Sequence, residues 1–150
     1  MILAHDIGTT GDKASLHDDD GRLVAATTAG YETRYDGNGV VEQDPADWWS
    51  AFCRATRALL DDNGVRPEAV SVVGVSGQMM GAVLLGAGLE PVRPAIIWAD
   101  TRSQEQCARL VGSIGQEAAY ELLGHRLNPT YSITKVMWVR ENEPEVFGQV

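Results

Sequence analysis

The residues with the clearest chemical potential lie near the start of the chain, directly after a short apolar run. Asp6-Ile7-Gly8-Thr9-Thr10-Gly11 follows Met1-Ile2-Leu3-Ala4, so a buried strand would deliver a carboxylate, two glycines and two hydroxyls into a tight turn. Glycines allow positive φ and let backbone N–H groups approach an anion closely. A carboxylate beside phosphates typically holds a divalent cation. The segment predicts a phosphate and Mg²⁺ loop; the alternative is an ordinary hairpin turn with Asp6 as turn former.

A second polar cluster, Ser76-Gly77-Gln78-Met79-Met80-Gly81, follows another apolar run. The ends of strands are where α/β sheets place ligand contacts. Gln78 could hydrogen-bond hydroxyl groups of a ligand, with the two methionines lining the pocket wall. The alternative is that Met79 and Met80 fill gaps in the core.

A third cluster places Asp100 and Arg102 after an apolar strand. Both side chains could reach one cleft, and a polyol site needs such groups because each hydroxyl requires a donor and an acceptor. The alternative is that Asp100 caps a helix starting near Thr101, while Arg102 pairs with Glu105 or Gln106.

Composition limits the classes of protein to consider. The net charge of −9 argues against a nucleic-acid binder, which usually presents a basic face. Cys53 and Cys107 do not form a disulfide framework, and both fall in stretches with a helical pattern. The three histidines lie far apart in the sequence, without the spacing of zinc ligands. No signal peptide or membrane span is predicted, so we expect a cytoplasmic protein.

The elements that must position these clusters alternate as in an α/β domain. Turn chemistry after residues 7 and 17 predicts an antiparallel meander of three strands, and Asp44-Pro45 predicts the start of a helix ending near Asp62. Residues 31–43 are expected to be irregular. A buried strand, two further strands and three helices are then predicted, at 70–75, 80–85, 94–98, 100–114, 115–123 and from 133 to Pro144. No domain boundary is predicted within residues 1–150.

Taken in order, the motifs resemble those of the FGGY family of carbohydrate kinases, closest to its xylulokinase branch. The motifs are Asp6–Lys13, Glu42–Pro45, Trp48-Trp49, Ser76–Gly81 and Pro94–Arg102. Similar segments follow at Leu127–Tyr131, Lys135, Trp138 and Asn142–Glu145. The resemblance covers essentially the whole chain. It implies an actin-like ATPase, ribonuclease-H-like α/β fold, with residues 1–150 forming an incomplete part of the N-terminal domain.

The resemblance also implies an activity: ATP-dependent phosphorylation of a ketopentose, D-xylulose to D-xylulose 5-phosphate, by the full-length protein. ATP and Mg²⁺ would lie between two domains. By matching position, Asp6 would be the catalytic residue that holds Mg²⁺. The residues implied to bind phosphate are Gly8, Thr9, Thr10 and Lys13. Those implied to bind the sugar are Gln78, Met79, Met80, Asp100 and Arg102.

The sequence departs from the family pattern at Met80. Xylulokinases commonly carry His there, so one hydrogen-bonding group is missing. Ribulose, a glycerol-like polyol or a non-catalytic sugar-sensing role therefore remain alternatives. Family members are much longer, and their general-base Asp lies beyond the position of residue 150, as do the second phosphate loop and the adenine site. We therefore expect these 150 residues alone to be inactive. The expected partners are the sugar and ATP, without nucleic acid or membrane; a homodimer of the full-length protein is left open.

Overall fold

The computed structural model describes all 150 residues and divides the chain into two compact units. Unit 1 comprises Met1–Thr33 and Asp44–Gln78, and unit 2 comprises Arg34–Gln43 and Met79–Val150. No linker-like composition marks these divisions in the sequence. No helix is both long enough and apolar enough to cross a bilayer.

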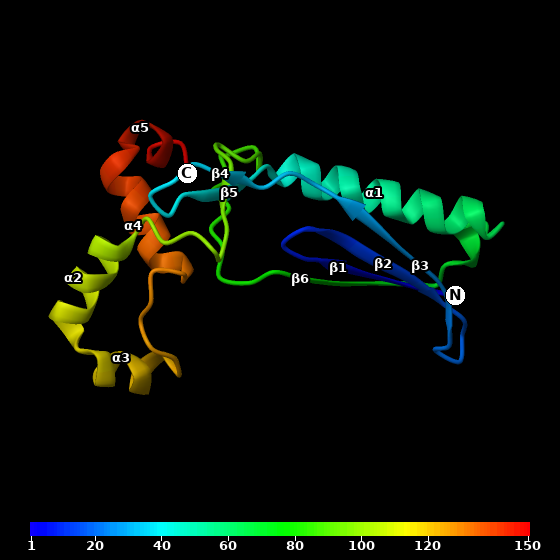
Figure 1. Cartoon of the computed structure of the whole chain (residues 1–150), viewed down its shortest axis with the longest axis horizontal. Helices are drawn as coiled ribbons and strands as arrows, with labels where there is room; N and C mark the ends of the chain where they lie inside the picture. The colour runs from blue at the N-terminus through cyan, green and yellow to red at the C-terminus, as the bar shows by residue number, and fades with distance from the viewer. The chain divides into compact units, whose positions relative to one another are not determined.

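Unit 1 is a four-stranded sheet with one long helix (Figure 1). Its strand order is β3-β2-β1-β6. Strands β1, β2 and β3 form the predicted antiparallel meander, and β6 runs parallel to β1. The elements are β1 (Ile2–Ile7), β2 (Gly11–His17), β3 (Leu23–Gly30), α1 (Pro45–Asp62), the 3₁₀ helix η1 (Pro67–Ala69) and β6 (Val72–Gly77).

Helix α1 begins as predicted. The Asp44 side chain accepts a hydrogen bond from the Ala46 amide at 2.9 Å, and Pro45 occupies the first helical position. The buried face of α1 packs on one face of the sheet through a core of five residues: Leu3, Ala14, Leu16, Ala55 and Leu59. Because side chains alternate along a strand, the neighbouring residues of β1 and β2 lie on the opposite face of the sheet.

Strand β6 corrects one prediction. A strand exists where the β-branched run indicated one, but all six of its residues are exposed. It lies at the edge of the sheet with β1 as its only strand neighbour. The valine-rich composition therefore reported β propensity correctly, while the prediction of burial was wrong within this chain.

Unit 2 combines a small three-stranded sheet, in the order β4-β5-β7, with four helices. Its elements are β4 (Arg34–Tyr35), β5 (Val41–Gln43), β7 (Ala95–Ile96), α2 (Gln104–Ile114), α3 (Gln116–Leu123), α4 (Ser132–Asn142) and α5 (Pro144–Phe147). One buried cluster joins Ala82, Leu84, Ile96 and Val139, and a second joins Cys107, Ala119 and Leu127.

Two strand predictions in unit 2 were wrong. Residues 31–43 are not wholly irregular, because β4 and β5 pair antiparallel. Residues 80–85 form no strand and make only isolated bridges, Ala82 to Ile96 and Leu85 to Pro91. The β4–β5 pair is local but very short, whereas β5 also pairs with β7, which lies far along the sequence, where local patterns give no signal. The helices from Gln116 and Ser132 agree with the prediction, while the helix predicted from residue 100 begins only at Gln104. Helix α4 ends at Asn142, and Pro144 starts α5.

Candidate active site

The loop after β1 is a closed turn whose register defines the surroundings of Asp6. The Gly8 amide donates to the carbonyl oxygens of Asp6 and Gly11, each at 3.0 Å. Asp6 pairs in register with Lys13 on β2 and with Ser76 on β6. Asp6 and Lys13 are exposed, on the sheet face opposite the buried Leu3 and Ala14. The structure thus brings two of the predicted site residues, Asp6 and Lys13, together beside the loop.

The glycines of this loop act through close approach. Neither Gly8 nor Gly11 has a positive φ, so neither uses the left-handed conformation that glycine allows. A Cβ atom at Gly11 would lie 2.8 Å from the carbonyl oxygen of Ala29 on β3. Glycine is required at residue 11 because β2 and β3 approach so tightly there.

Two hydroxyl groups from the segment after β3 contact the loop from the side. The Tyr31 phenol donates to the carbonyl oxygen of Gly8. The Thr33 hydroxyl donates to the carbonyl oxygen of Thr9 at 3.4 Å. Burial, followed by the negative charges of Asp12 and Asp6, raises the pKa of Tyr31 to about 12. The phenol therefore keeps its proton at neutral pH and acts as a donor.

A buried polar chain lies under the loop on the α1 side of the sheet. His5 Nδ1 is 2.7 Å from Asp12 Oδ2, and both side chains are fully buried. His5 Nε2 is 3.3 Å from the Thr56 hydroxyl on α1, and the imidazole ring stacks on Phe52 with centroids 3.8 Å apart. Sequence reasoning missed this pair. The signal was present, since His5 and Asp12 share the alternation of the buried Leu3 and Ala14.

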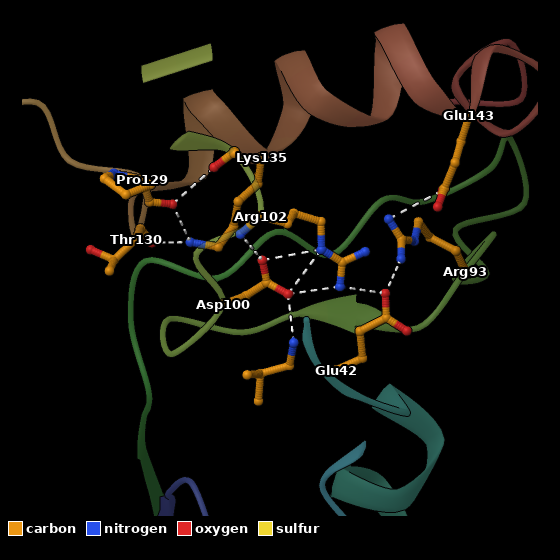
Figure 2. A network of polar contacts seen from close by, with 10 residues as sticks. Glu42, Arg93, Asp100, Arg102, Pro129, Thr130, Lys135 and Glu143 are labelled. Carbon is orange, nitrogen blue, oxygen red and sulfur yellow. Dashed lines mark hydrogen bonds and ion pairs between the residues drawn. The ribbon is translucent and has the colours of Figure 1, made fainter. Parts of the chain in front are cut away.

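In unit 2, Asp100 and Arg102 form the centre of a buried ionic network (Figure 2). Arg102 donates to Asp100 from Nε, at 3.1 and 2.9 Å to the two carboxylate oxygens, and from Nη2 at 2.7 Å. The same Nη2 reaches Glu42 Oε1 at 2.7 Å, and that oxygen also accepts from Arg93. Burial acts to lower the pKa of Arg102, but the hydrogen bonds to Asp100 and Glu42 outweigh it and raise the pKa.

This arrangement contradicts the alternative in which Asp100 caps a helix. Helix α2 begins at Gln104, after Ser103, and Asp100 instead accepts from the backbone N–H of Arg102 at 3.0 Å, two residues on. Asp100 also accepts from the Val41 amide at 2.6 Å. Arg102 pairs with Asp100 and Glu42, so the expected pairing with Glu105 or Gln106 was wrong. Glu42 and Arg93 were missed because they lie 51 residues apart in the sequence.

Lys135 is the one cation of this region whose contacts are with carbonyl groups. Its ammonium group points toward the carbonyl oxygens of Pro129, at 3.2 Å, and Thr130 (Figure 2). The residue is fully buried. Burial lowers the pKa of Lys135 to about 8, and the positive charge of Arg102 adds to this effect, while Asp100 opposes it.

The remaining predicted residues lie, along the chain, at the boundary where unit 1 ends at Gln78 and unit 2 resumes at Met79. The Gln78 amide donates to the carbonyl oxygen of Ile7, at the end of β1, at 2.9 Å. Met79 is 73% exposed, so it does not fill a gap in the core. Met80 is half-buried and takes a left-handed conformation with φ of 62°, which is uncommon for a residue other than glycine.

The Mg²⁺ ion that the motif implies would find few protein ligands in this chain. No group of three or more His, Cys, Asp or Glu side chains is arranged to hold a metal. Beside the turn, Asp6 offers an exposed carboxylate without a salt bridge. Mg²⁺ is commonly held by one or two carboxylates together with water and substrate phosphates. A single exposed carboxylate beside the closed Gly8–Gly11 turn fits that mode.

Comparison with known proteins decides the family. Residues 1–150 match the N-terminal domain of the FGGY family of carbohydrate kinases along their whole length. The chain belongs to this family. It is 36% identical over 150 residues to a xylulose kinase from Escherichia coli K12, and 36% identical over 146 residues to a glycerol kinase from Symbiobacterium thermophilum.

The fold of this FGGY chain matches solved structures as well. A xyloylose kinase from Brucella ovis superposes with a TM-score of 0.91 at 35% identity, over 99% of this chain and 30% of that one. The match confirms the predicted α/β fold of the actin-like ATPase type. The alignments cover 100% of this chain but 30% of the E. coli kinase, and 97% of this chain but 29% of the S. thermophilum kinase. The chain thus spans about a third of the length of these relatives.

Proposed function

We propose that the protein containing this chain is an ATP-dependent carbohydrate kinase that phosphorylates a ketopentose, D-xylulose to D-xylulose 5-phosphate. The observation that carries the proposal is the exposed carboxylate of Asp6 beside the closed Gly8–Gly11 turn, with Lys13 opposite it in register. Phosphoryl transfer depends mainly on positioning and on neutralising charge, and this arrangement supplies the means for both.

Each residue beside the turn has a distinct part in this proposal. Asp6 would hold Mg²⁺, which when bound neutralises charge on the phosphate groups. Lys13 adds a cation on the same face of the sheet, and the turn formed by Gly8, Thr9 and Thr10 offers backbone amides and hydroxyls to phosphate oxygens.

The sugar would be bound by side chains that the family resemblance assigns. Gln78 can exchange hydrogen bonds with hydroxyls, and Met79 and Met80 provide apolar contact. Asp100 is fully buried, and its oxygens already accept several hydrogen bonds. Its proposed part is therefore to hold Arg102 in place at the border of the pocket.

The relatives support sugar kinase activity in general more strongly than they support any particular sugar as the substrate. A xylulose kinase and a glycerol kinase share the same 36% identity with this chain. D-Xylulose is the proposed substrate because the motif order is closest to that branch. Glycerol, ribulose and a sugar-sensing role without catalysis are the alternatives that the experiment must separate.

The test uses the intact protein and its Asp6→Asn variant. ADP release is measured with D-xylulose, D-ribulose and glycerol in turn, and sugar binding is measured by calorimetry. We expect turnover with D-xylulose and a loss of about 100-fold in kcat for Asp6→Asn, because one charge-stabilising group is removed. Asp62→Asn, an exposed carboxylate at the end of α1, is the matched control and should retain full activity.

The outcomes separate the alternatives. Turnover with glycerol but not with D-xylulose would replace the proposed substrate. Sugar binding without any ADP release would favour the sensing role. Full activity of Asp6→Asn would contradict the assignment of the loop as the phosphate and Mg²⁺ site.

A further inference from the structure

Two consecutive carbonyl groups of the loop after β1 accept hydrogen bonds from side chains outside the loop. The phenol of Tyr31 donates to Gly8, and the hydroxyl of Thr33 donates to Thr9. Both donors come from the short segment that leaves β3, and both lie in unit 1 with the loop. Neither residue belongs to the motif that identified the loop in the sequence.

Peptide geometry gives these two contacts a consequence for anion binding. The chain contains no cis peptide bond. In a planar trans peptide, the carbonyl of one residue and the N–H of the next point in opposite directions. Drawing the carbonyls of Gly8 and Thr9 toward residues 31–33 therefore turns the N–H groups of Thr9 and Thr10 away from that segment. Successive N–H groups presented in this way form the concave site that binds phosphate oxygens.

We propose that Tyr31 and Thr33 are positioning residues for the phosphates of ATP, acting through the carbonyl groups of Gly8 and Thr9. The proposal rests on the proposed function, because it concerns the same loop. It adds two residues that the family motif does not include and gives them a role without direct contact with the nucleotide.

The surroundings of Tyr31 favour this role over proton transfer. The phenol is part-buried where it meets the loop, and burial, followed by the charges of Asp12 and Asp6, raises its pKa. A protonated phenol donates one hydrogen bond, and here that bond goes to a backbone carbonyl. The hydroxyl can thus be removed while the aromatic ring stays in place, which separates positioning from packing.

The experiment measures KM for ATP, KM for the sugar and kcat in the intact protein. Tyr31→Phe and Thr33→Val each remove one donor while retaining the shape of the side chain. We expect KM for ATP to rise about 5- to 10-fold in each, the effect of one hydrogen bond, while KM for the sugar stays within twofold. Thr33→Ser keeps a hydroxyl and should restore KM for ATP. Tyr35→Phe, which alters a 71%-exposed tyrosine on β4, is the matched control.

Binding of ATP to the same variants, followed by calorimetry, provides a second readout that needs no turnover. An unchanged affinity for ATP in the Tyr31→Phe/Thr33→Val double variant would overturn the proposal. A rise in both KM values, for ATP and for the sugar, together with a loss of thermal stability would also overturn it. That pattern indicates a purely structural role. If the wild-type protein phosphorylates no sugar, the proposed function fails first, and the calorimetric result still decides whether these residues position the loop.

Discussion

At the scale of single residues, the buried cations Arg102 and Lys135 differ in how their charges are balanced. Arg102 faces two carboxylates, Asp100 and Glu42. Lys135 is equally well buried but points at two backbone carbonyls, with no carboxylate in contact. Carbonyl groups compensate only part of the cost of burying an ammonium group. The native structure therefore favours the neutral form of Lys135, and stability should depend on pH through this residue.

The expected effect has a definite sign. The pKa of Lys135 is about 8 in the folded protein, against an ordinary value of 10.5. Between these values the unfolded chain binds more protons at this site, so the free energy of unfolding rises with pH. Below the lower value the cost of burying the charge is constant. Relative to Lys135→Met, the wild-type protein should gain on the order of 2 kcal/mol from pH 8 to 10.5.

Urea unfolding of the wild type, Lys135→Met and Lys135→Gln across this pH range tests that expectation. Both variants lack the titrating group, so their curves should share one pH dependence from which the wild type departs. Three parallel curves would show that Lys135 ionises in the folded protein as it does in the unfolded chain.

At the scale of elements, β1 and β2 place different chemistry on the two faces of one sheet. Asp6 and Lys13 lie on the face proposed to meet phosphate, while His5 and Asp12 lie buried against α1. The buried pair joins the two strands directly beneath the loop. Removing one partner of such a pair leaves an uncompensated buried polar group. Replacing both partners by apolar residues leaves no such group and avoids its energetic cost.

A double-mutant cycle therefore has a predicted outcome. Asp12→Val and His5→Leu should each lower the free energy of unfolding by about 3 kcal/mol. The double variant should lose much less than the sum. Asp20→Ala removes the exposed ion pair with Arg22 and should cost less than about 1 kcal/mol, as a control. Additive losses in the cycle, measured by urea unfolding, would mean that the two residues contribute independently.

The elements also show where sequence reasoning succeeds. The meander of β1 to β3 and the start of α1 at Asp44 were predictable because turn and capping residues act within a few positions. The partners of Asp100 and Arg102 were not predictable. Val41 lies 59 residues before Asp100, and Glu42 lies 60 residues before Arg102. Tyr31 was missed for the same reason, because its contact with Gly8 spans 23 residues.

At the scale of the whole molecule, the distribution of carboxylates bears on what these 150 residues can do alone. Transfer to a sugar hydroxyl needs a base with a free acceptor within hydrogen-bond reach. Asp100 is buried and accepts from Arg102 and Val41, and Asp12 is paired with His5. Asp6 is the residue proposed to hold the metal. Asp12 and Asp100 are both fully buried and held by His5 and Arg102, so neither is exposed to take a proton from a sugar hydroxyl.

We accordingly expect the isolated 150-residue chain to show no sugar-dependent release of ADP. Its Asp6 loop and the residues proposed to bind the sugar would remain, so we attribute the expected loss of activity to the lack of a base and of domain closure around the substrates. The assay compares the chain with the intact protein at equal concentration, using D-xylulose and ATP. The chain carrying Asp6→Asn sets the background. Sugar-dependent ADP release above that background would show that a base lies within these residues and would reassign one of the buried carboxylates.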